Sequence, residues 1–324
     1  MAEYPRTLAE FEARFPDEKA CLAYLCRLRW PNGYRCRHCQ NEKFWEIGNG
    51  KRECGGCGRQ SSVTSGTIFQ DSRQPLRTWF RAMWYMTSQK TGASALGVQR
   101  VLGLGSYQTA WTMLHKLRRA MVRPDRPRLK GRVEVDETFW GAPEEGAYGR
   151  GAQKKVLIAV GAEEDGEGIG RIRMGRIPNA SGKSLERFVR ESIDQGSVVH
   201  TDGWEGYGAW LDKDYGHDVS ILKGKPAEAA SELLPRVHRV VSLLKRWLMG
   251  THQGAVSHEH LDDYLNEFTF RFNRRTSRSR GLLFYRLLGQ AVTVGSVTYK
   301  GMVKGVRKNR AAQGTTTGRE HLRE

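Results

Sequence analysis

Four cysteines near the N-terminus stand in two Cys-x2-Cys pairs, Cys36 with Cys39 and Cys54 with Cys57. Two thiolates spaced in this way can converge on one ion, and two such pairs complete the tetrahedron of a closed structural zinc site. Disulfides are the alternative, but all six cysteines lie within the first 57 residues, whereas a secreted disulfide protein would spread them more widely. The spacing therefore predicts a zinc ribbon with a structural Zn ion.

The other two cysteines, Cys21 and Cys26, lie on a predicted helix that also carries Leu22, Leu25 and Leu28. A thiol among leucines is typical of a buried free cysteine, which behaves as a small apolar residue. We expect neither thiol to bind the metal.

The charge of the chain indicates the kind of partner that it binds. Its 53 Lys and Arg against 35 Asp and Glu give a formal net charge of +18, which favours a polyanion such as nucleic acid or an acidic membrane. A zinc ribbon alone can bind DNA, mediate protein contacts or staple a small domain, but six basic residues beside the cysteines favour DNA: Arg35, Arg37, Lys43, Lys51, Arg52 and Arg59. We expect double-stranded DNA as the partner.

A membrane is the weaker alternative for a polyanionic partner. No apolar run approaches the roughly 20 residues that cross a bilayer. The N-terminal stretch carries acids such as Glu3, Glu10 and Asp17 where a signal peptide would have an apolar core. We therefore expect no membrane contact and a cytoplasmic protein.

Between residues 75 and 122 the apolar residues recur at helical spacing and predict three helices. The last two are joined by Gly103-Leu104-Gly105, a turn of the length found in helix-turn-helix motifs. In the final helix Gln108 is placed to reach base edges, and three later residues are placed to contact phosphates: Lys116, Arg118 and Arg119. An ordinary small helical bundle with a charged face is the alternative.

A basic linker with two prolines, residues 123–131 (RPDRPRLKG), marks a domain boundary, because it resists both helix and central strand. Beyond it, Val133 and Val135 alternate with acids, as in a half-buried strand. Residues 155–161 (KVLIAVG) are nearly all apolar, which suits a central strand, and the alternation of 171–174 predicts a third strand.

A helix over 181–193 then leads to a fourth strand over 197–201, and 218–222 is a candidate fifth strand. Two longer helices follow, over about 231–249 and 258–275, each with an apolar stripe.

Two aspartates end strands of this predicted sheet, Asp136 the first strand and Asp202 the fourth. If the first three strands form a meander, a right-handed crossover through the helix at 181–193 brings the fourth strand parallel to the first and the aspartates together. Paired carboxylates can share two divalent ions that stabilise the attacking and leaving oxygens of a phosphoryl displacement. Their hard oxygens favour Mg or Mn over zinc.

The pattern as a whole predicts an α+β multidomain chain. We expect an N-terminal helix and zinc ribbon over 1–70, a helix-turn-helix-like domain over 71–125, a mixed α/β catalytic domain over 130–300 and a basic, disordered tail over 301–324.

Four segments in chain order resemble the bacterial insertion-sequence transposases of the ISXO-like group: VEVDETFWG (133–141), HTDGWEGY (200–207), VHRVVSLLKR (237–246) and YLNEFTFRFNRR (264–275). The likeness covers about residues 11–298. It implies a zinc ribbon followed by a ribonuclease-H-like DDE catalytic domain, in which Asp136 and Asp202 are the first two metal-binding acids.

The resemblance also implies a third catalytic residue seven positions before a lysine. That lysine is similar in position to Lys245, so the third residue is His238, with 35 residues between it and Asp202. The commonest residue there is Glu, although Asn or His is seen within the group. Imidazole can bind a metal or move a proton but is a poorer Mg²⁺ ligand than carboxylate. Glu232 and Glu267 are the substitutes to consider.

This likeness implies a DNA transposase in which metal-activated water attacks the phosphodiester at a transposon end and the freed 3′-hydroxyl attacks target DNA. Lys245 is then expected to contact a phosphate, and Arg274 and Arg275 to follow the DNA backbone. Two ends must be held together during joining, so we expect a homo-oligomer on DNA.

Three alternatives stay open at this point. The chain can be a catalytically inactive DNA-binding protein derived from a transposase, a ribonuclease-H-like nuclease that cuts without joining, or a zinc-ribbon platform for protein contacts.

Overall fold

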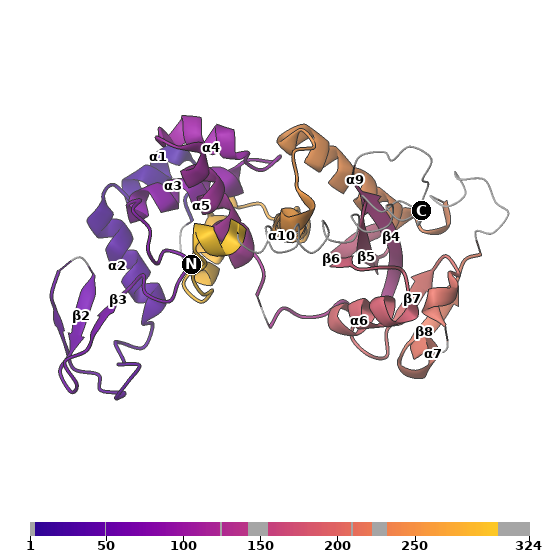
Figure 1. Ribbon diagram of the computed structural model, residues 1–324, viewed down its shortest axis with the longest axis horizontal. Coiled ribbons are helices and arrows are strands. Elements are labelled where there is room, and N and C mark those ends of the chain that lie inside the picture. Colours follow the sequence, from indigo (N-terminus) through magenta and orange to yellow (C-terminus); the bar gives the residue numbers. More distant parts are fainter. Residues whose placement is uncertain are drawn as a thin grey trace, which may run out of the picture. The chain divides into compact units, whose positions relative to one another are not determined.

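The computed structural model describes residues 4–48, 50–123, 125–141, 155–208, 210–221 and 232–303. The chain divides into two compact units, one formed by Met1–Met121 with Arg278–Glu324 and the other by Val122–Ser277 (Figure 1). The fold class is confirmed, since a cysteine cluster near the N-terminus precedes a mixed α/β domain. Of the predicted tail over 301–324, residues 304–324 lie outside the part of the chain that the structure describes. Among the helices described, none has the length and apolar character that crossing a bilayer requires.

The first unit begins with two helices, α1 (Leu8–Arg14) and α2 (Glu18–Arg29). Asp17 caps α2, because its side chain accepts a hydrogen bond from the Ala20 N–H. A three-stranded antiparallel sheet follows, in the order β1 (Phe44–Glu46), β2 (Lys51–Cys54) and β3 (Gln60–Ser62). This small sheet has little core of its own, so Arg52 helps to hold it: its guanidinium lies 4.2 Å from the ring centroids of both Trp30 and Phe44.

The three helices predicted after the ribbon are confirmed as α3 (Leu76–Ser88), α4 (Ala95–Leu102) and α5 (Tyr107–Ala120). Ser94 and Ser106 cap the last two with their side chains. Gly103 ends α4 with a φ of 63°, a left-handed conformation that glycine adopts without strain.

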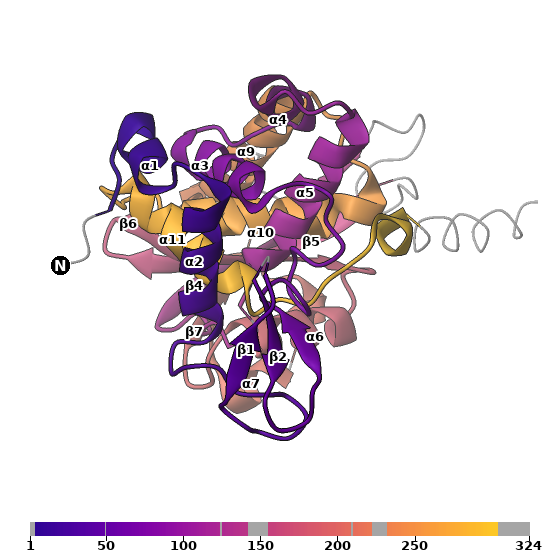
Figure 2. The ribbon, with the colours of Figure 1, turned by 90° about the vertical axis from the view of Figure 1, so that its left-hand side faces the viewer.

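A further helix, α11 (Arg280–Ala291), packs in this first unit, although we placed residues up to 300 in the catalytic domain. Phe284 is fully buried there and lies 5.2 Å from the ring of Phe11 and 5.8 Å from that of Phe80. Figure 2 shows α11 beside α3. Burial of this aromatic residue draws the C-terminal helix to the N-terminal ones, which corrects that boundary.

The second unit is built on a five-stranded sheet with the order β6-β5-β4-β7-β8. The strands β4 (Arg132–Trp140), β5 (Val156–Asp165) and β6 (Gly168–Ile177) form an antiparallel meander. After the crossover helix α6 (Gly182–Ser192), β7 (Val198–Thr201) returns parallel to β4, and β8 (Gly216–Val219) is parallel to β7. This is the topology predicted from the strand pattern.

Helices cover both faces of this sheet, with α6 on one side and α9 (Pro235–His252) on the other (Figure 1). The helix α10 (Leu261–Phe272), which follows η3 (His258–His260), packs on β6. Alternate residues of β4 serve the two faces: Val133 and Val135 belong to the core under α6, while Glu134 faces α9. The short η2 (Glu205–Tyr207) and α7 (Trp210–Asp214) complete the α6 side.

Candidate functional site

The fold brings the two predicted catalytic aspartates to neighbouring strands, but only Asp202 follows the end of its strand, β7; Asp136 lies in the middle of β4, because β4 continues to Trp140 in its pairing with β5, which corrects the expectation that Asp136 ends the first strand. In the parallel pair of β4 and β7, Glu134 lies opposite His200, and Asp136 and Asp202 each lie two residues beyond that pair. Burial raises the pKa of Tyr207 well above its ordinary value, and the charges of Glu137, Asp136 and Asp202 add to this shift. The charges of both aspartates therefore act on the same buried side chain.

The local chain geometry fixes each carboxylate. Oδ1 of Asp136 accepts a 2.7 Å hydrogen bond from the N–H of Glu137, and Oδ1 of Asp202 accepts one of 3.0 Å from the N–H of Trp204. The turn after Asp202 requires glycine, because Gly203 has a φ of 78° and a Cβ there would lie 2.9 Å from a Val219 methyl.

His238 joins this pair from the first turns of α9. Its Nε2 lies 3.7 Å from Oδ2 of Asp136, which is too long for a hydrogen bond. Nε2 is buried and has no hydrogen-bond partner among the described residues. Burial lowers the pKa of His238, against the opposing charges of Glu134 and Asp202, so the neutral imidazole that can bind a metal is favoured.

Lys245 lies two turns further along α9, where its side chain is exposed. Desolvation lowers the pKa of its ammonium group, while the charge of Asp136 raises it. The four residues that the sequence singled out thus come from the middle of β4, the residue after β7, and α9, the helix that covers this face of the sheet.

Glu267 and Glu232, the alternatives to His238 as the third catalytic residue, differ from it in position and burial. Glu267 is fully buried on α10 and forms a 2.8 Å ion pair with Arg271, and α10 packs on β6, two strands away from β4. Glu232 is exposed just before α9.

The side chains that converge here fit a divalent ion. Two carboxylates offer hard oxygen ligands of the kind that Mg²⁺ and Mn²⁺ prefer, and the buried Nε2 of His238 lacks any other partner among the residues described. The donor set of Asp136, Asp202 and His238 suits Mn²⁺ better than Mg²⁺, because Mn²⁺ accepts a nitrogen ligand more readily.

A second group of possible metal ligands includes Glu134, two residues before Asp136 in β4. Ligand atoms of Glu134, Glu164 and His200 lie within 4.8 Å of one another. Two guanidinium groups already neutralise these carboxylates: Arg132 donates to Glu164 at 2.8 Å and Arg236 donates to Glu134 at 3.0 Å. We interpret this group as an ion-pair network that supports the site.

Sequence reasoning missed two carboxylates that flank Asp136 in β4. Glu134 accepts hydrogen bonds from the start of α9, and Glu137 accepts one from the hydroxyl of Tyr207 on the opposite face. The available signal was the position of Glu134, an acid in a buried strand that needs a partner.

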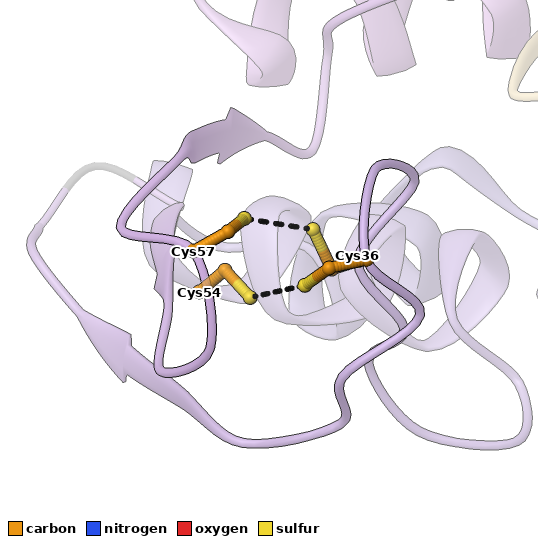
Figure 3. A group of neighbouring side chains, drawn as sticks. Cys36, Cys54 and Cys57 are labelled. Carbon is orange, nitrogen blue, oxygen red and sulfur yellow. Dashed lines mark hydrogen bonds between the residues drawn. The ribbon is translucent and has the colours of Figure 1, made fainter.

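The four cysteines predicted to hold zinc are brought together, since ligand atoms of Cys36, Cys39, Cys54 and Cys57 all lie within 4.8 Å of one another. Sγ of Cys36 is 3.6 Å from that of Cys57, and Sγ of Cys39 is 3.4 Å from that of Cys54. Figure 3 shows the thiols of Cys36, Cys54 and Cys57 pointing toward one another. A tetrahedron with Zn–S bonds of about 2.3 Å has S–S edges of about 3.8 Å, so the four thiols fit zinc.

The pKa values of the clustered thiols shift in both directions: despite the backbone N–H of Asn41, hydrogen bonds with the neighbouring thiols and burial raise that of Cys39 to about 12. The backbone N–H groups of Cys39 and His38 lower the pKa of the Cys36 thiol to about 6, which favours the thiolate. Cys21 is buried, as predicted, and burial raises its pKa to about 12, so it stays a neutral thiol.

The residues predicted to contact DNA from α5 differ in their access to solvent. Gln108 is exposed at the start of the helix, and Arg119 is half-buried. Lys116 is only 7% exposed and its ammonium donates to the Gln70 carbonyl, while Arg118 is 1% exposed. Burial of these two side chains does not support the predicted phosphate contacts.

The two arginines at the end of α10 are also engaged within their own unit. The Arg274 guanidinium lies 4.1 Å from the Phe270 ring centroid and donates to the Phe270 carbonyl. That of Arg275 donates to the carbonyls of Gly170, Ile169 and Phe272. The Arg275 bonds to Ile169 and Gly170 tie the end of α10 to β6, while the Arg274 contacts stay within α10, so neither set of contacts supports the predicted role along a DNA backbone.

Comparisons with known proteins agree with this architecture. Residues 128–273 match the ISXO2-like transposase domain family, and residues 16–60 match the transposase zinc-ribbon domain family. An uncharacterized protein in the transposable element ISH50 of Halobacterium salinarum is 26% identical over 277 residues, which cover 79% of this chain and 91% of that protein. The two domain matches stand in the order that the motifs predicted, so residues 128–273 are similar to ISXO2-like transposase domains and residues 16–60 to transposase zinc ribbons.

Proposed function

We propose that the chain cuts DNA at the ends of an insertion element and joins those ends to target DNA. The observation that carries the proposal is the position of Asp136 and Asp202 on the neighbouring parallel strands β4 and β7, with His238 of α9 3.7 Å from Asp136. Divalent ions bound there supply charge stabilisation for the attacking and leaving oxygens of a phosphodiester.

Each residue has a distinct role in this proposal. The carboxylates of Asp136 and Asp202 hold Mg²⁺ or Mn²⁺, and the neutral His238 imidazole offers a third ligand or accepts a proton at Nε2. The exposed ammonium of Lys245 binds a phosphate near the scissile bond. The zinc ribbon and the exposed Gln108 contribute further contacts to the DNA.

Cleavage of a duplex that contains the element end, in the presence of Mn²⁺ or Mg²⁺, tests the proposal. We expect Asp136→Asn and Asp202→Asn each to slow nicking on the order of 10³-fold, because each removes a charge that holds the metal. Glu191→Gln is a matched control, since Glu191 is an exposed acid paired with Arg187 on α6. Equal cleavage by wild type and the two asparagine variants would overturn the proposal.

The DNA products of this assay distinguish two other candidate functions. His238 in place of a carboxylate favours an inactive DNA-binding protein, which binds the end duplex but yields no nick. A ribonuclease-H-like nuclease yields nicks but never a strand-transfer product. Joined end–target molecules that depend on Asp136 and Asp202 support transposition over both.

Joining requires two ends at once, so we propose that two or more copies assemble on DNA. The mass of the complex with a single end duplex, compared with that of the free chain, tests this. A complex that holds one chain and one end under cleavage conditions contradicts it.

A further inference from the structure

The helix that carries His238 begins without a capping side chain of its own. Its N-cap residue, Leu234, makes no side-chain hydrogen bond to the helix, and Pro235 at the first position has no N–H. The N–H groups of Arg236 and Val237 are therefore the donors of the first turn that need an outside acceptor.

Glu134 supplies that acceptor from β4. Its Oε2 accepts hydrogen bonds from the N–H of Arg236 at 2.8 Å and from the N–H of Val237 at 2.9 Å. Its Oε1 accepts a third from Nη1 of Arg236 at 3.0 Å, and the side chain is fully buried. A carboxylate at this point satisfies the donors and also interacts favourably with the positive end of the helix dipole.

Arg236 extends the connection to the hairpin between β5 and β6. Its Nε donates to the Gly168 carbonyl at 2.9 Å, and its Nη2 donates to the Gly166 carbonyl at 2.6 Å. Hydrogen bonds to β4 and to the β5–β6 hairpin thus fix the position of the first turn of α9 on the sheet.

We propose that Glu134 is a positioning residue that sets His238 against Asp136. Glu134 precedes Asp136 by two residues, so both project from the same face of β4, and the N–H of Val237 that it binds is one residue before His238. One rigid contact therefore sets the separation of 3.7 Å between His238 and Asp136. The inference rests on the proposed function of that pair.

Hydrogen exchange of the full chain, without metal or DNA, tests the contact itself. Glu134→Gln keeps the shape but loses the charge, and we expect the peptide over 234–241 to exchange at least about tenfold faster than in wild type. Glu163→Gln is the matched control: Glu163 is a buried acid of the same sheet that accepts from Lys130 and Arg171 instead. It leaves exchange over 234–241 unchanged.

Mn²⁺ binding, followed by electron paramagnetic resonance, then tests positioning. We expect Glu134→Gln to weaken Mn²⁺ binding about tenfold in the wild-type background and to add nothing in the His238→Ala background, because it acts through His238. Glu163→Gln has no effect in either background. Should Glu134→Gln fail to fold, Arg236→Gln keeps the carboxylate, removes the tie to the hairpin and is expected to speed exchange over 234–241.

The inference is overturned if that peptide exchanges as in wild type in the Glu134→Gln and Arg236→Gln variants, or if the losses of the Glu134 and His238 variants add. Failure of the proposed function has a different signature: wild type that folds but binds no Mn²⁺ and cuts no DNA. The exchange result does not depend on either activity.

Discussion

The hydroxyl of Tyr207 donates a 2.5 Å hydrogen bond to Oε1 of Glu137, on the face of the sheet opposite to α9. Tyr207 follows Asp202 by five residues, and Glu137 follows Asp136 directly. The bond therefore joins the two chain segments that carry the aspartates, within a core where Tyr207 is only 1% exposed.

Tyr207→Phe removes this bond without changing the ring. We expect the free energy of unfolding to fall by about 1–3 kcal/mol, because the variant takes away a donor to a charged acceptor in a buried setting. We also expect slower cleavage, since the loop that carries Asp202 loses its tie to β4. Urea denaturation and the nicking assay measure the two effects.

Tyr215→Phe is the matched control for this variant. Tyr215 lies in the same core, but its hydroxyl donates only a 3.4 Å hydrogen bond to the Ile193 carbonyl. We expect a smaller loss of stability and unchanged cleavage. An equal effect of the two variants on cleavage contradicts a specific link to Asp202.

Much of the fold of the second unit, Val122–Ser277, follows from local sequence pattern. Alternating and continuous apolar runs gave the strands, and the crossover rule then placed Asp136 beside Asp202. The role of Glu134 could not be predicted, because its partner is the backbone of a helix about 100 residues later. The alternation of apolar residues identifies a strand, but it does not show which distant N–H groups hydrogen-bond to a polar side chain on that strand.

The basic residues show a second limit. Lys116, Arg118 and Arg275 were predicted to meet phosphates, yet the structure buries the first two and directs the third to backbone carbonyls. A guanidinium donates equally well to a phosphate and a carbonyl oxygen, and long aliphatic stems allow burial, so residue type alone cannot decide. The position of α11 was missed for a related reason, since the packing of Phe284 is long-range.

The metal preference of the site should depend on His238. With one nitrogen ligand the wild type is expected to prefer Mn²⁺ over Mg²⁺, and His238→Glu supplies a hard oxygen instead. We expect the ratio of nicking rates in Mn²⁺ and Mg²⁺ to fall about tenfold. His258→Glu, on η3, is the control and should leave the ratio unchanged; a constant ratio in His238→Glu would show that this residue is not a ligand.

Zinc content should depend on the four clustered thiols. We expect one zinc ion per chain in wild type and substantially less in Cys54→Ser, because three thiols leave the tetrahedron open. Since zinc binding and folding of such a small sheet are coupled, hydrogen exchange in β1 to β3 should rise with the loss of metal. Cys26→Ala, on α2, is the control and keeps its zinc; full zinc occupancy in Cys54→Ser would contradict the assignment.

Measurements of DNA affinity and of its salt dependence should distinguish the roles of Gln108 and Arg275. Gln108 is exposed at the capped start of α5, where an amide can pair with a base edge, so Gln108→Ala should weaken binding to the element end by about 1–3 kcal/mol. The slope of log affinity against log salt should stay the same, because the amide releases no counterion. Arg275→Ala should lower stability, since the guanidinium holds carbonyls of Gly170 and Phe272, and should also leave the slope unchanged. If the magnitude of the slope falls by about 0.9 in Arg275→Ala, the arginine contacts a DNA phosphate after all.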